Sequence, residues 1–310
     1  MKYLLFAVIL FFTNVSAQDT TAVDQAAPAV EQAAPAVEAA QASEAVVTEE
    51  STEEEKPFAL SLSVGRGNVW RGQPLGLPDH VCVQPSFSYQ VTPELSVGGW
   101  MTTAFHNNNP TQGYDEFDVY ASYTVNDMIT LGVSSYYFPA LELADGETNP
   151  SWTDFSGAGK QTLDATVTLD LSSKFNQPIT ILWSTFLGGA DVDDEDVRQY
   201  TSYAEATYSF ENENMGISGS ATVGAIVFGN KSAYYSFAKE GFNLINIGGK
   251  VSKDVTSMVP FMENISKSMW VSFTFNPQIS DENETTTYYG ASDESKIGAA
   301  LISAGMQFDF

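Results

Sequence analysis

The chain has 310 residues, of which 13% are aromatic and one is cysteine, and it carries a formal net charge of −26. A single cysteine excludes an intrachain disulfide framework and a thiolate metal cluster. The acidic balance argues against nucleic acid and anionic bilayer surfaces as partners. No run of about 18 apolar residues occurs after residue 17, which excludes a helical membrane protein.

Residues 1–17, MKYLLFAVILFFTNVSA, have the pattern of a secretory signal peptide. Lys2 precedes an apolar run, and the small residues Val15, Ser16 and Ala17 stand where a signal peptidase reads. The run is too short to be a spanning helix. We expect cleavage after Ala17 and export of the chain from the cytoplasm.

Residues 18–56 are predicted to be a disordered acidic linker rich in Ala, Pro and Glu. The motif QAAPAVE occurs at 25–31 and again at 32–38, and the segment carries a net charge of −9. A proline in each repeat opposes a helix, and low hydrophobicity with charge of one sign is typical of disorder. We expect this linker to lie in the periplasm.

From residue 57 to residue 310 the hydrophobic pattern has a period of two. In TLDATVTLDL (162–171), Leu, Ala and Val alternate with Thr and Asp, which indicates a strand with one apolar face and one polar face. Twelve such segments of about ten residues, the length of a tilted transmembrane strand, begin near Phe58, Val81, Leu95, Asp118, Met128, Thr162, Ile179, Ser202, Gly216, Asn243, Ser268 and Ala299.

The connectors between these segments alternate between mostly short and long. Short turns on one side and long loops on the other are typical of outer-membrane barrels. A sheet in hydrocarbon must close into a barrel, because an open edge would leave backbone N–H and C=O groups without hydrogen-bond partners. The sequence therefore predicts an all-β fold: a closed antiparallel transmembrane β-barrel of about 12 strands in an up-and-down meander. The connector 253–267 is long for a periplasmic turn and is the weakest point of the strand count. A soluble β-sandwich is the alternative.

One stretch carries a family resemblance. The segment 65–100 contains Trp70-Arg71-Gly72 and, after a strand ending in Tyr89, the motif VGGW; LGVSSYYFP follows at 131–139. These motifs resemble the TorF family of porin-like proteins, over about a third of the chain. The resemblance implies an outer-membrane barrel and supplies no catalytic residues. The acidic linker and an Asp-rich loop depart from the family.

The first hairpin allows a prediction of register. If Thr92, Pro93 and Glu94 form a three-residue loop, paired residue numbers sum to 186, which sets Phe87 opposite Gly99 on the lipid face. The same register sets His80 opposite His106 at the outer rim. Two imidazoles near Asp79 could hold a divalent metal or serve a rim hydrolase, although two polar rim residues meeting by chance is the plainer interpretation.

Charged residues on the polar faces are candidates for lining a lumen. Arg66 and Arg71 flank the first long loop and could form a charged constriction or satisfy neighbouring groups. The others are Asp118, Asp164, Asp170, Glu205, Lys250 and Asp309. Five of these six are acidic, so a pore would prefer cations; the alternative is hydrogen bonding inside the barrel without conduction.

A second candidate metal site is the loop ADVDDEDVRQY (190–200). Its carboxylates could hold Ca²⁺ or Mg²⁺, or the loop could be solvated and share ions loosely with lipopolysaccharide. The glycine that an EF-hand loop needs is missing. The candidate ligands are Asp191, Asp193, Asp194, Glu195 and Asp196.

The chain ends in LISAGMQFDF, an alternating strand with a terminal aromatic residue. Phe308 and Phe310 are expected to face lipid near the interface, where aromatic girdles lie. By resemblance to bacterial outer-membrane barrels, this ending is also the signal that the barrel-insertion machinery reads.

The leading hypothesis is a monomeric porin-like channel for small polar solutes in a Gram-negative outer membrane, with a weak preference for cations. We expect no cofactor, no enzymatic activity and no nucleic-acid partner; outer-membrane lipids and lipopolysaccharide are the expected surroundings. The alternatives are a non-conducting barrel that presents acidic loops for adhesion or scaffolding, and more remotely a hydrolase that uses His80 or His106.

Overall fold

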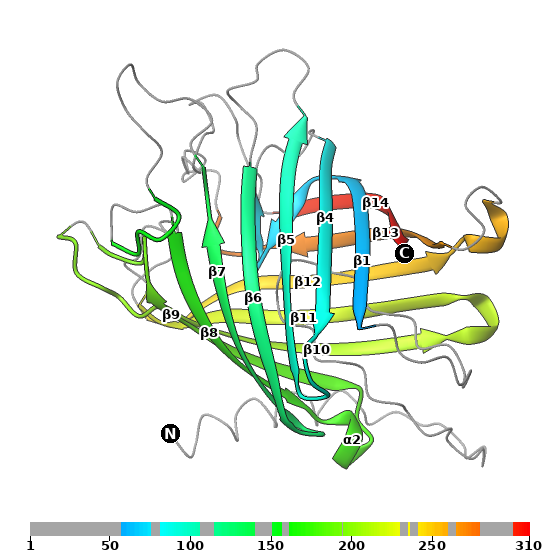
Figure 1. The fold of residues 1–310 in the computed structure, drawn as a ribbon, viewed down its shortest axis with the longest axis horizontal. Coiled ribbons are helices and arrows are strands. Elements are labelled where there is room, and N and C mark those ends of the chain that lie inside the picture. The colour runs from blue at the N-terminus through cyan, green and yellow to red at the C-terminus, as the bar shows by residue number, and fades with distance from the viewer. Residues whose placement is uncertain are drawn as a thin grey trace. The chain divides into compact units, whose positions relative to one another are not determined.

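The protein forms a closed barrel of twelve antiparallel strands (Figure 1). The computed structural model describes residues 57–75, 81–105, 115–139, 151–156, 161–193, 195–229, 235, 241–259, 265–279 and 300–310. The predicted signal peptide and linker lie outside the described residues. The predicted fold class is confirmed.

Each predicted strand is present, and each begins within three residues of its expected start. The barrel strands are β1 (Phe58–Arg66), β4 (Val81–Gln90), β5 (Leu95–Phe105), β6 (Asp115–Asn126), β7 (Ile129–Tyr137), β8 (Gln161–Asp170), β9 (Ile179–Gly188), β10 (Ser202–Asn212), β11 (Ile217–Phe228), β12 (Asn243–Asp254), β13 (Ser266–Phe275) and β14 (Ala300–Asp309). The long connector between β12 and β13 does not change the count.

The last strand closes the barrel against the first. Strand β1 pairs with β4 on one side and with β14 on the other, where Val64 lies opposite Met306 and Leu62 opposite Phe308. Every barrel strand therefore has a hydrogen-bonded neighbour on both sides, and the barrel has no open edge.

The predicted register of the first hairpin is confirmed. Phe87 lies opposite Gly99, and a Cβ added to that glycine would come within 2.7 Å of the Phe87 ring, so the ring covers the glycine backbone. Next to Pro85 the ladder to β5 lacks two pairs and then resumes in the same register. A missing proline N–H interrupts the ladder without inserting a residue.

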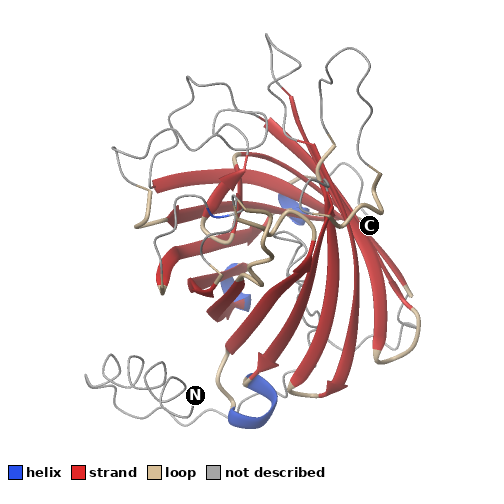
Figure 2. Cartoon of the chain, turned by 90° about the vertical axis from the view of Figure 1, so that its left-hand side faces the viewer, coloured by secondary structure: helices blue, strands red, loops and turns tan. Residues whose placement is uncertain are grey.

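The two ends of the barrel differ. Both chain ends of the barrel, the connectors 91–94, 127–128, 171–178 and 213–216, and residues 255–259 after β12 lie at one end, which we call the turn end. The other end, the loop end, carries the longer connectors. Short helical segments, α2 (Ser172–Phe175), η2 (Glu213–Met215) and η4 (Thr256–Met258), lie in the turn-end connectors (Figure 2). None of the helices formed by the described residues has the length and apolar character that crossing a membrane requires.

Alternation divides the strands into an outward apolar face and an inward polar face. On β13, Val271 and Phe273 are 54% and 47% exposed, whereas Trp270 and Ser272 between them are 4% and 6% exposed. Most inward residues are Ser, Thr, Gln or carboxylates. The barrel is therefore apolar outside and polar inside.

The sequence did not predict strands β2 (Asn68–Trp70) and β3 (Gln73–Leu75), which form a hairpin in the first long loop. We call residues 67–75 the inner hairpin, because its side chains contact inward residues of strands on the opposite side of the barrel.

Candidate functional site

The tip of the inner hairpin is a tight turn at Arg71 and Gly72. Both residues have positive φ, 47° and 76°, as the favoured two-residue hairpin turn requires. Glycine adopts this conformation without cost, but for arginine the left-handed region costs roughly 1–2 kcal/mol. A non-glycine residue held there is an indicator of function.

Gly72 is held against the barrel backbone. A Cβ at this position would lie 1.9 Å from the carbonyl oxygen of Ile245, and Asn276 donates a hydrogen bond from Nδ2 to the Gly72 carbonyl at 3.1 Å. Only glycine allows so close an approach, so the hairpin tip is fixed at this depth by sterics and by one buried hydrogen bond.

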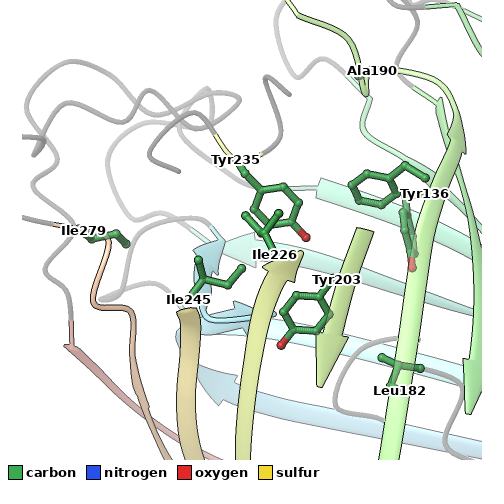
Figure 3. Close-up of a cluster of buried hydrophobic side chains, with 9 residues drawn as sticks. Tyr136, Leu182, Ala190, Tyr203, Ile226, Tyr235, Ile245 and Ile279 are labelled. Atoms are coloured by element: carbon green, nitrogen blue, oxygen red, sulfur yellow. The ribbon is translucent and has the colours of Figure 1, made fainter. Parts of the chain in front are cut away.

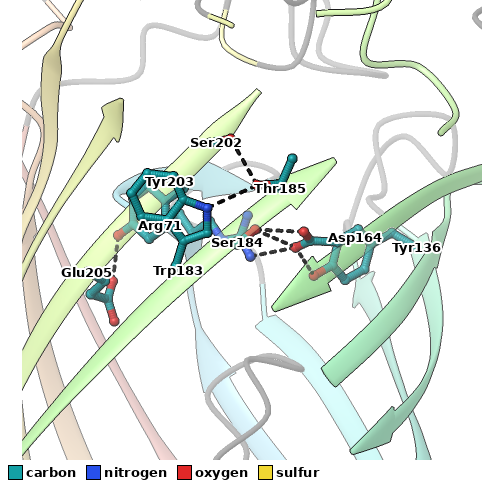
Figure 4. Close-up of polar contacts among 9 residues, drawn as sticks. All are labelled: Arg71, Tyr136, Asp164, Trp183, Ser184, Thr185, Ser202, Tyr203 and Glu205. Atoms are coloured by element: carbon teal, nitrogen blue, oxygen red, sulfur yellow. Dashed lines mark hydrogen bonds and ion pairs between the residues drawn. The ribbon is translucent and has the colours of Figure 1, made fainter. Parts of the chain in front are cut away.

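Arg71 forms a buried ion pair with Asp164 of β8. Its Nη2 lies 2.7 Å from Oδ2 of Asp164, and the two side chains are 1% and 0% exposed. Tyr136 of β7 donates its hydroxyl to the same carboxylate at 2.9 Å, and Ser184 of β9 donates to it at 2.7 Å (Figure 4). Charge-assisted hydrogen bonds of this kind compensate the desolvation of the carboxylate.

Aromatic rings surround the guanidinium. The Arg71 Cζ lies 4.4 Å from the ring centroid of Trp70, 5.1 Å from that of Tyr203 and 5.8 Å from that of Phe186. These distances are within the range of cation–π attraction, which strengthens when the cation is desolvated.

Phe186 and Tyr203 also belong to an apolar cluster inside the barrel (Figure 3). Trp70 packs against this cluster: it stacks on Phe186 and on Tyr235, each at 6.2 Å between centroids, and meets Tyr136 edge-on at 5.7 Å. Further apolar members of the cluster are Leu182, Ala190, Ile226, Ile245 and Ile279. The inner hairpin is thus tightly packed inside the barrel, and we call the wall residues around its tip the seat of the hairpin.

A second carboxylate, Glu205 of β10, lies near this seat. It accepts hydrogen bonds from the Tyr203 hydroxyl, from Nδ2 of Asn246 at 3.0 Å and from the Thr207 hydroxyl at 3.2 Å. Glu205 also interacts electrostatically with Arg71. The guanidinium therefore lies in the field of two carboxylates, each oriented by hydroxyl or amide donors of the wall.

Inward residues are buried to different extents along the barrel. At the level of the hairpin, Ser184 and Ile226 have no exposed surface. Nearer the turn end, Thr180, Ser209 and Ser252 are partly buried, whereas Thr130 and Thr168 are buried. The interior is therefore filled at the level of the hairpin.

Most predicted lining residues face inward, but they serve different contacts. Asp118 is 3% exposed. Asp170 accepts a hydrogen bond from the backbone N–H of Ser172 at 2.7 Å in the turn-end connector. Lys250 and Asp309 contact neighbouring inward side chains. Lys250 Nζ lies 5.5 Å from the ring centroid of Trp270, and Asp309 accepts a hydrogen bond from Nε2 of Gln307 at 2.9 Å.

Arg66 is a correction to the predicted set. It lies opposite Val81 and Ala304 at the end of β1, on the outward face, and it is exposed. The alternation of β1 explains this, because Ser63 and Gly65 occupy the inward positions. Of the two arginines expected at a constriction, only Arg71 contributes.

The predicted metal sites receive no support in the part of the chain that the structure describes. No three His, Cys, Asp or Glu side chains there lie close enough to hold an ion. Asp191 accepts hydrogen bonds from the Thr201 N–H at 2.9 Å and from its hydroxyl, and Asp193 accepts from the N–H groups of Glu195 and Val197 at 3.0 Å.

These carboxylates thus shape the loop, and the loop geometry places Asp196 at a φ of 60°. Exposed Glu195 lies beside it. Asp79, His80, His106 and Asp194 lie outside the described residues.

The C-terminal aromatic residues lie on the outward face of the barrel, and their contact with lipid stays a prediction. Phe310 is 50% exposed, and its backbone N–H donates to the carbonyl of Leu60 at 3.0 Å. Phe308 pairs with Leu62 on the outward face. Their recognition by the insertion machinery stays a prediction.

Several contact residues of the site were not predicted, namely Tyr136, Ser184, Phe186, Tyr203 and Asn246. A signal was present in the sequence: on β9 the inward face carries Leu182 and Phe186 beside Thr180 and Ser184. Large apolar side chains on an otherwise polar face indicate that something packs against them inside the barrel.

Comparisons with known proteins identify a family and distant structural similarities. A family model described as "Bacterial protein of unknown function (Gcw_chp)" matches residues 51–252. No curated protein is a match. The TorF resemblance is not confirmed by these comparisons.

Three solved structures are similar at low identity. A chain from work on the in-meso crystallization of membrane proteins has 7% identity and a TM-score of 0.38, covering 82% of this chain and 83% of that one. A Pseudomonas aeruginosa FadL homologue has 11% identity and a TM-score of 0.33, with 82% and 74% covered. BamA from Haemophilus ducreyi lacking POTRA domains 1–3 has 12% identity and a TM-score of 0.28, with 82% and 64% covered.

Proposed function

The chain belongs to the Gcw_chp family of bacterial proteins, whose function is unknown, and we propose that it is an outer-membrane β-barrel that provides a porin-like passive path for small polar solutes. In this proposal the turn end faces the periplasm, the loop end faces outward, and the inner hairpin forms the constriction. The observation that carries the proposal is the buried pair of Arg71 and Asp164 inside a barrel that is polar within and apolar without.

The outward face supports a membrane location. Mid-strand residues such as Val133 and Val167 are 41% and 40% exposed, and soluble proteins rarely expose continuous apolar surface of this kind. Aromatic residues gather toward the turn end, as in the girdles of outer-membrane barrels. They are Phe58, Tyr89, Tyr123, Tyr208, Phe210 and Phe310, between 43% and 50% exposed.

The interior supports passage of polar solutes. A barrel of eight strands is filled by side chains, and one of sixteen to eighteen leaves an aqueous channel; twelve strands lie between these limits. Here the inner hairpin occupies the space that side chains of the wall do not fill. Its displacement would leave a lumen lined with Ser, Thr and carboxylates and, at the level of the hairpin, with the rings of Tyr136, Phe186 and Tyr203.

The charge of the inward face favours cations. Glu116 joins the five acidic residues predicted to line the lumen, against Arg71 and Lys250. A carboxylate-lined, low-dielectric passage attracts cations and repels anions.

Planar-bilayer recordings test the proposal. We expect small or rare channel events from the wild type, larger steady conductance when residues 67–75 are replaced by a Gly-Ser linker, and reversal potentials that favour K⁺ over Cl⁻ in a salt gradient. Arg66→Ala is the matched control, because Arg66 lies on the outward face, and it should behave as the wild type. Silence of both the wild type and the hairpin replacement would exclude the channel.

A second candidate is a non-conducting barrel that presents its loops for adhesion or scaffolding. The specific observation in its favour is the packed seat of the hairpin, where Phe186 and Tyr235 are 1% and 0% exposed. The same recordings decide between the two, because this candidate requires that the wild type never conduct, whether or not the hairpin replacement does.

A further inference from the structure

The seat of Arg71 has the chemistry of a binding site for a guanidinium group. All of its wall components are carried by barrel strands: Asp164 on β8, Phe186 on β9, and Tyr203 and Glu205 on β10. The cation that occupies the seat comes from the inner hairpin, which is a separate element. The recognition surface and its occupant can therefore be separated.

The acidic part of the seat is organised by the wall. The Asp164 carboxylate is oriented by the hydroxyls of Tyr136 and Ser184, at 2.9 Å and 2.7 Å, which come from the strands on either side of β8. Side chains locked by neighbouring hydrogen bonds keep their geometry when a ligand leaves, and such preorganisation favours binding.

The aromatic part of the seat selects the kind of cation. A guanidinium is planar, stacks on aromatic faces and is weakly hydrated, whereas an ammonium is a compact and strongly hydrated charge. The rings of Phe186 and Tyr203 lie 5.8 Å and 5.1 Å from Cζ of Arg71. Rings on one side and a fixed carboxylate on another match a planar cation with several donors.

The packed position of the hairpin includes features that lower its stability. Arg71 has a φ of 47°, and among the described residues the buried atoms Nδ2 of Asn68 and both side-chain polar atoms of Gln73 have no hydrogen-bond partner. Unpaired buried polar groups and left-handed arginine both oppose the seated state. An external cation thus competes with a tethered ligand that is not optimally held.

We propose that the seat of Arg71 is a guanidinium-binding site and that Arg71 acts as its tethered ligand. The solute class that the wall recognises is a small molecule with a terminal guanidinium group, which displaces the inner hairpin from the constriction. The transport of such a solute rests on the proposed function, whereas its binding to the site does not depend on conduction.

Chemical rescue tests the site directly. In purified full-length Arg71→Ala, the buried Asp164 lacks its cation, and we expect a lower thermal unfolding midpoint in detergent. Methylguanidinium should raise that midpoint in a saturable way, with half-saturation at about millimolar concentration, as expected for a ligand of this size. Tetramethylammonium and Na⁺ at equal ionic strength should not.

Two further variants make the test decisive. In Arg71→Ala/Asp164→Asn the rescue should disappear, and in Arg66→Ala methylguanidinium should have no effect beyond that on the wild type. If Arg71→Ala does not fold, the barrel with residues 67–75 replaced by a Gly-Ser linker takes its place with the same probes. Equal stabilisation by tetramethylammonium, or rescue that survives Asp164→Asn, would overturn the site.

The outcomes separate this inference from the proposed function. Rescue without conductance keeps the guanidinium site and removes the channel. Conductance of the hairpin replacement that methylguanidinium does not reduce, together with absent rescue, keeps the channel and removes the site.

Discussion

Asp164→Asn is the substitution that most directly tests the buried ion pair. The Arg71 side chain is 1% exposed, so removal of its ion-pair partner leaves a buried cation with only the electrostatic interaction of Glu205. Breaking a buried pair in this way typically costs about 3–5 kcal/mol, which corresponds to a loss of roughly a hundredfold to several thousandfold in the unfolding equilibrium constant. Tyr136 and Ser184 still find an acceptor in the amide oxygen, so their hydrogen bonds add little to the loss.

The assay is reversible urea unfolding of the barrel in detergent, followed by tryptophan fluorescence. A double-mutant cycle with Arg71→Gln isolates the pair, because the double variant has neither buried charge. We expect the double variant to be several kcal/mol more stable than the sum of the single losses implies. Asp170→Asn is the control: that carboxylate accepts one backbone hydrogen bond in a turn-end connector, which the amide oxygen can still accept, so the substitution should cost less than about 1 kcal/mol.

Additivity of Asp164→Asn and Arg71→Gln to within about 0.5 kcal/mol would refute the reasoning. It would mean that the two side chains do not depend on each other, and that the inner hairpin is not held by this contact.

Three other predictions follow from particular positions. Val133→Arg, on the outward face at mid-strand and 41% exposed, should lower the free energy of unfolding in lipid by about 2–4 kcal/mol. Phe175→Arg in α2, 56% exposed at the turn end, should lower it little. Equal losses for the two variants in bilayer unfolding experiments would contradict the membrane location. Gly72→Ala should displace the hairpin and raise conductance, because its Cβ would lie 1.9 Å from the carbonyl oxygen of Ile245. Gly241→Ala is the control: it is also at positive φ, but its Cβ would have nothing within 4 Å, so conductance should not change. Phe310→Ala should lower the amount of barrel inserted in cells and leave refolding into detergent unchanged, since the backbone hydrogen bond of residue 310 remains; unchanged insertion would remove the signal role.

The barrel itself could be predicted because its physics is local. A strand alternates its side chains between two faces, so Thr162 to Leu171 displays its inward and outward residues without any knowledge of its neighbours. The length of each segment and the alternation of connectors then set strand number and topology. The register of β4 and β5 followed from one short turn, and the structure reproduces it at Phe87 and Gly99.

The candidate site was predictable only in part. Arg71 and Asp164 were both expected to line the interior, but 93 residues separate them in the chain, and no pattern joined them. Arg66 was assigned to the same constriction, although one step of alternation places it outside. The inner hairpin was missed because strands of three residues are too short to show a period, and its turn carries arginine where asparagine is usual.

The sequence alone determined which face of each strand points outward and which points into the barrel, because period-two alternation is a property of the backbone and needs no partner. Only the tertiary structure decided which residues fill the interior. Closing the barrel brings the strands that carry Asp164, Phe186 and Tyr203 around one point, and there the desolvation of a carboxylate and of a guanidinium makes each charge require the other.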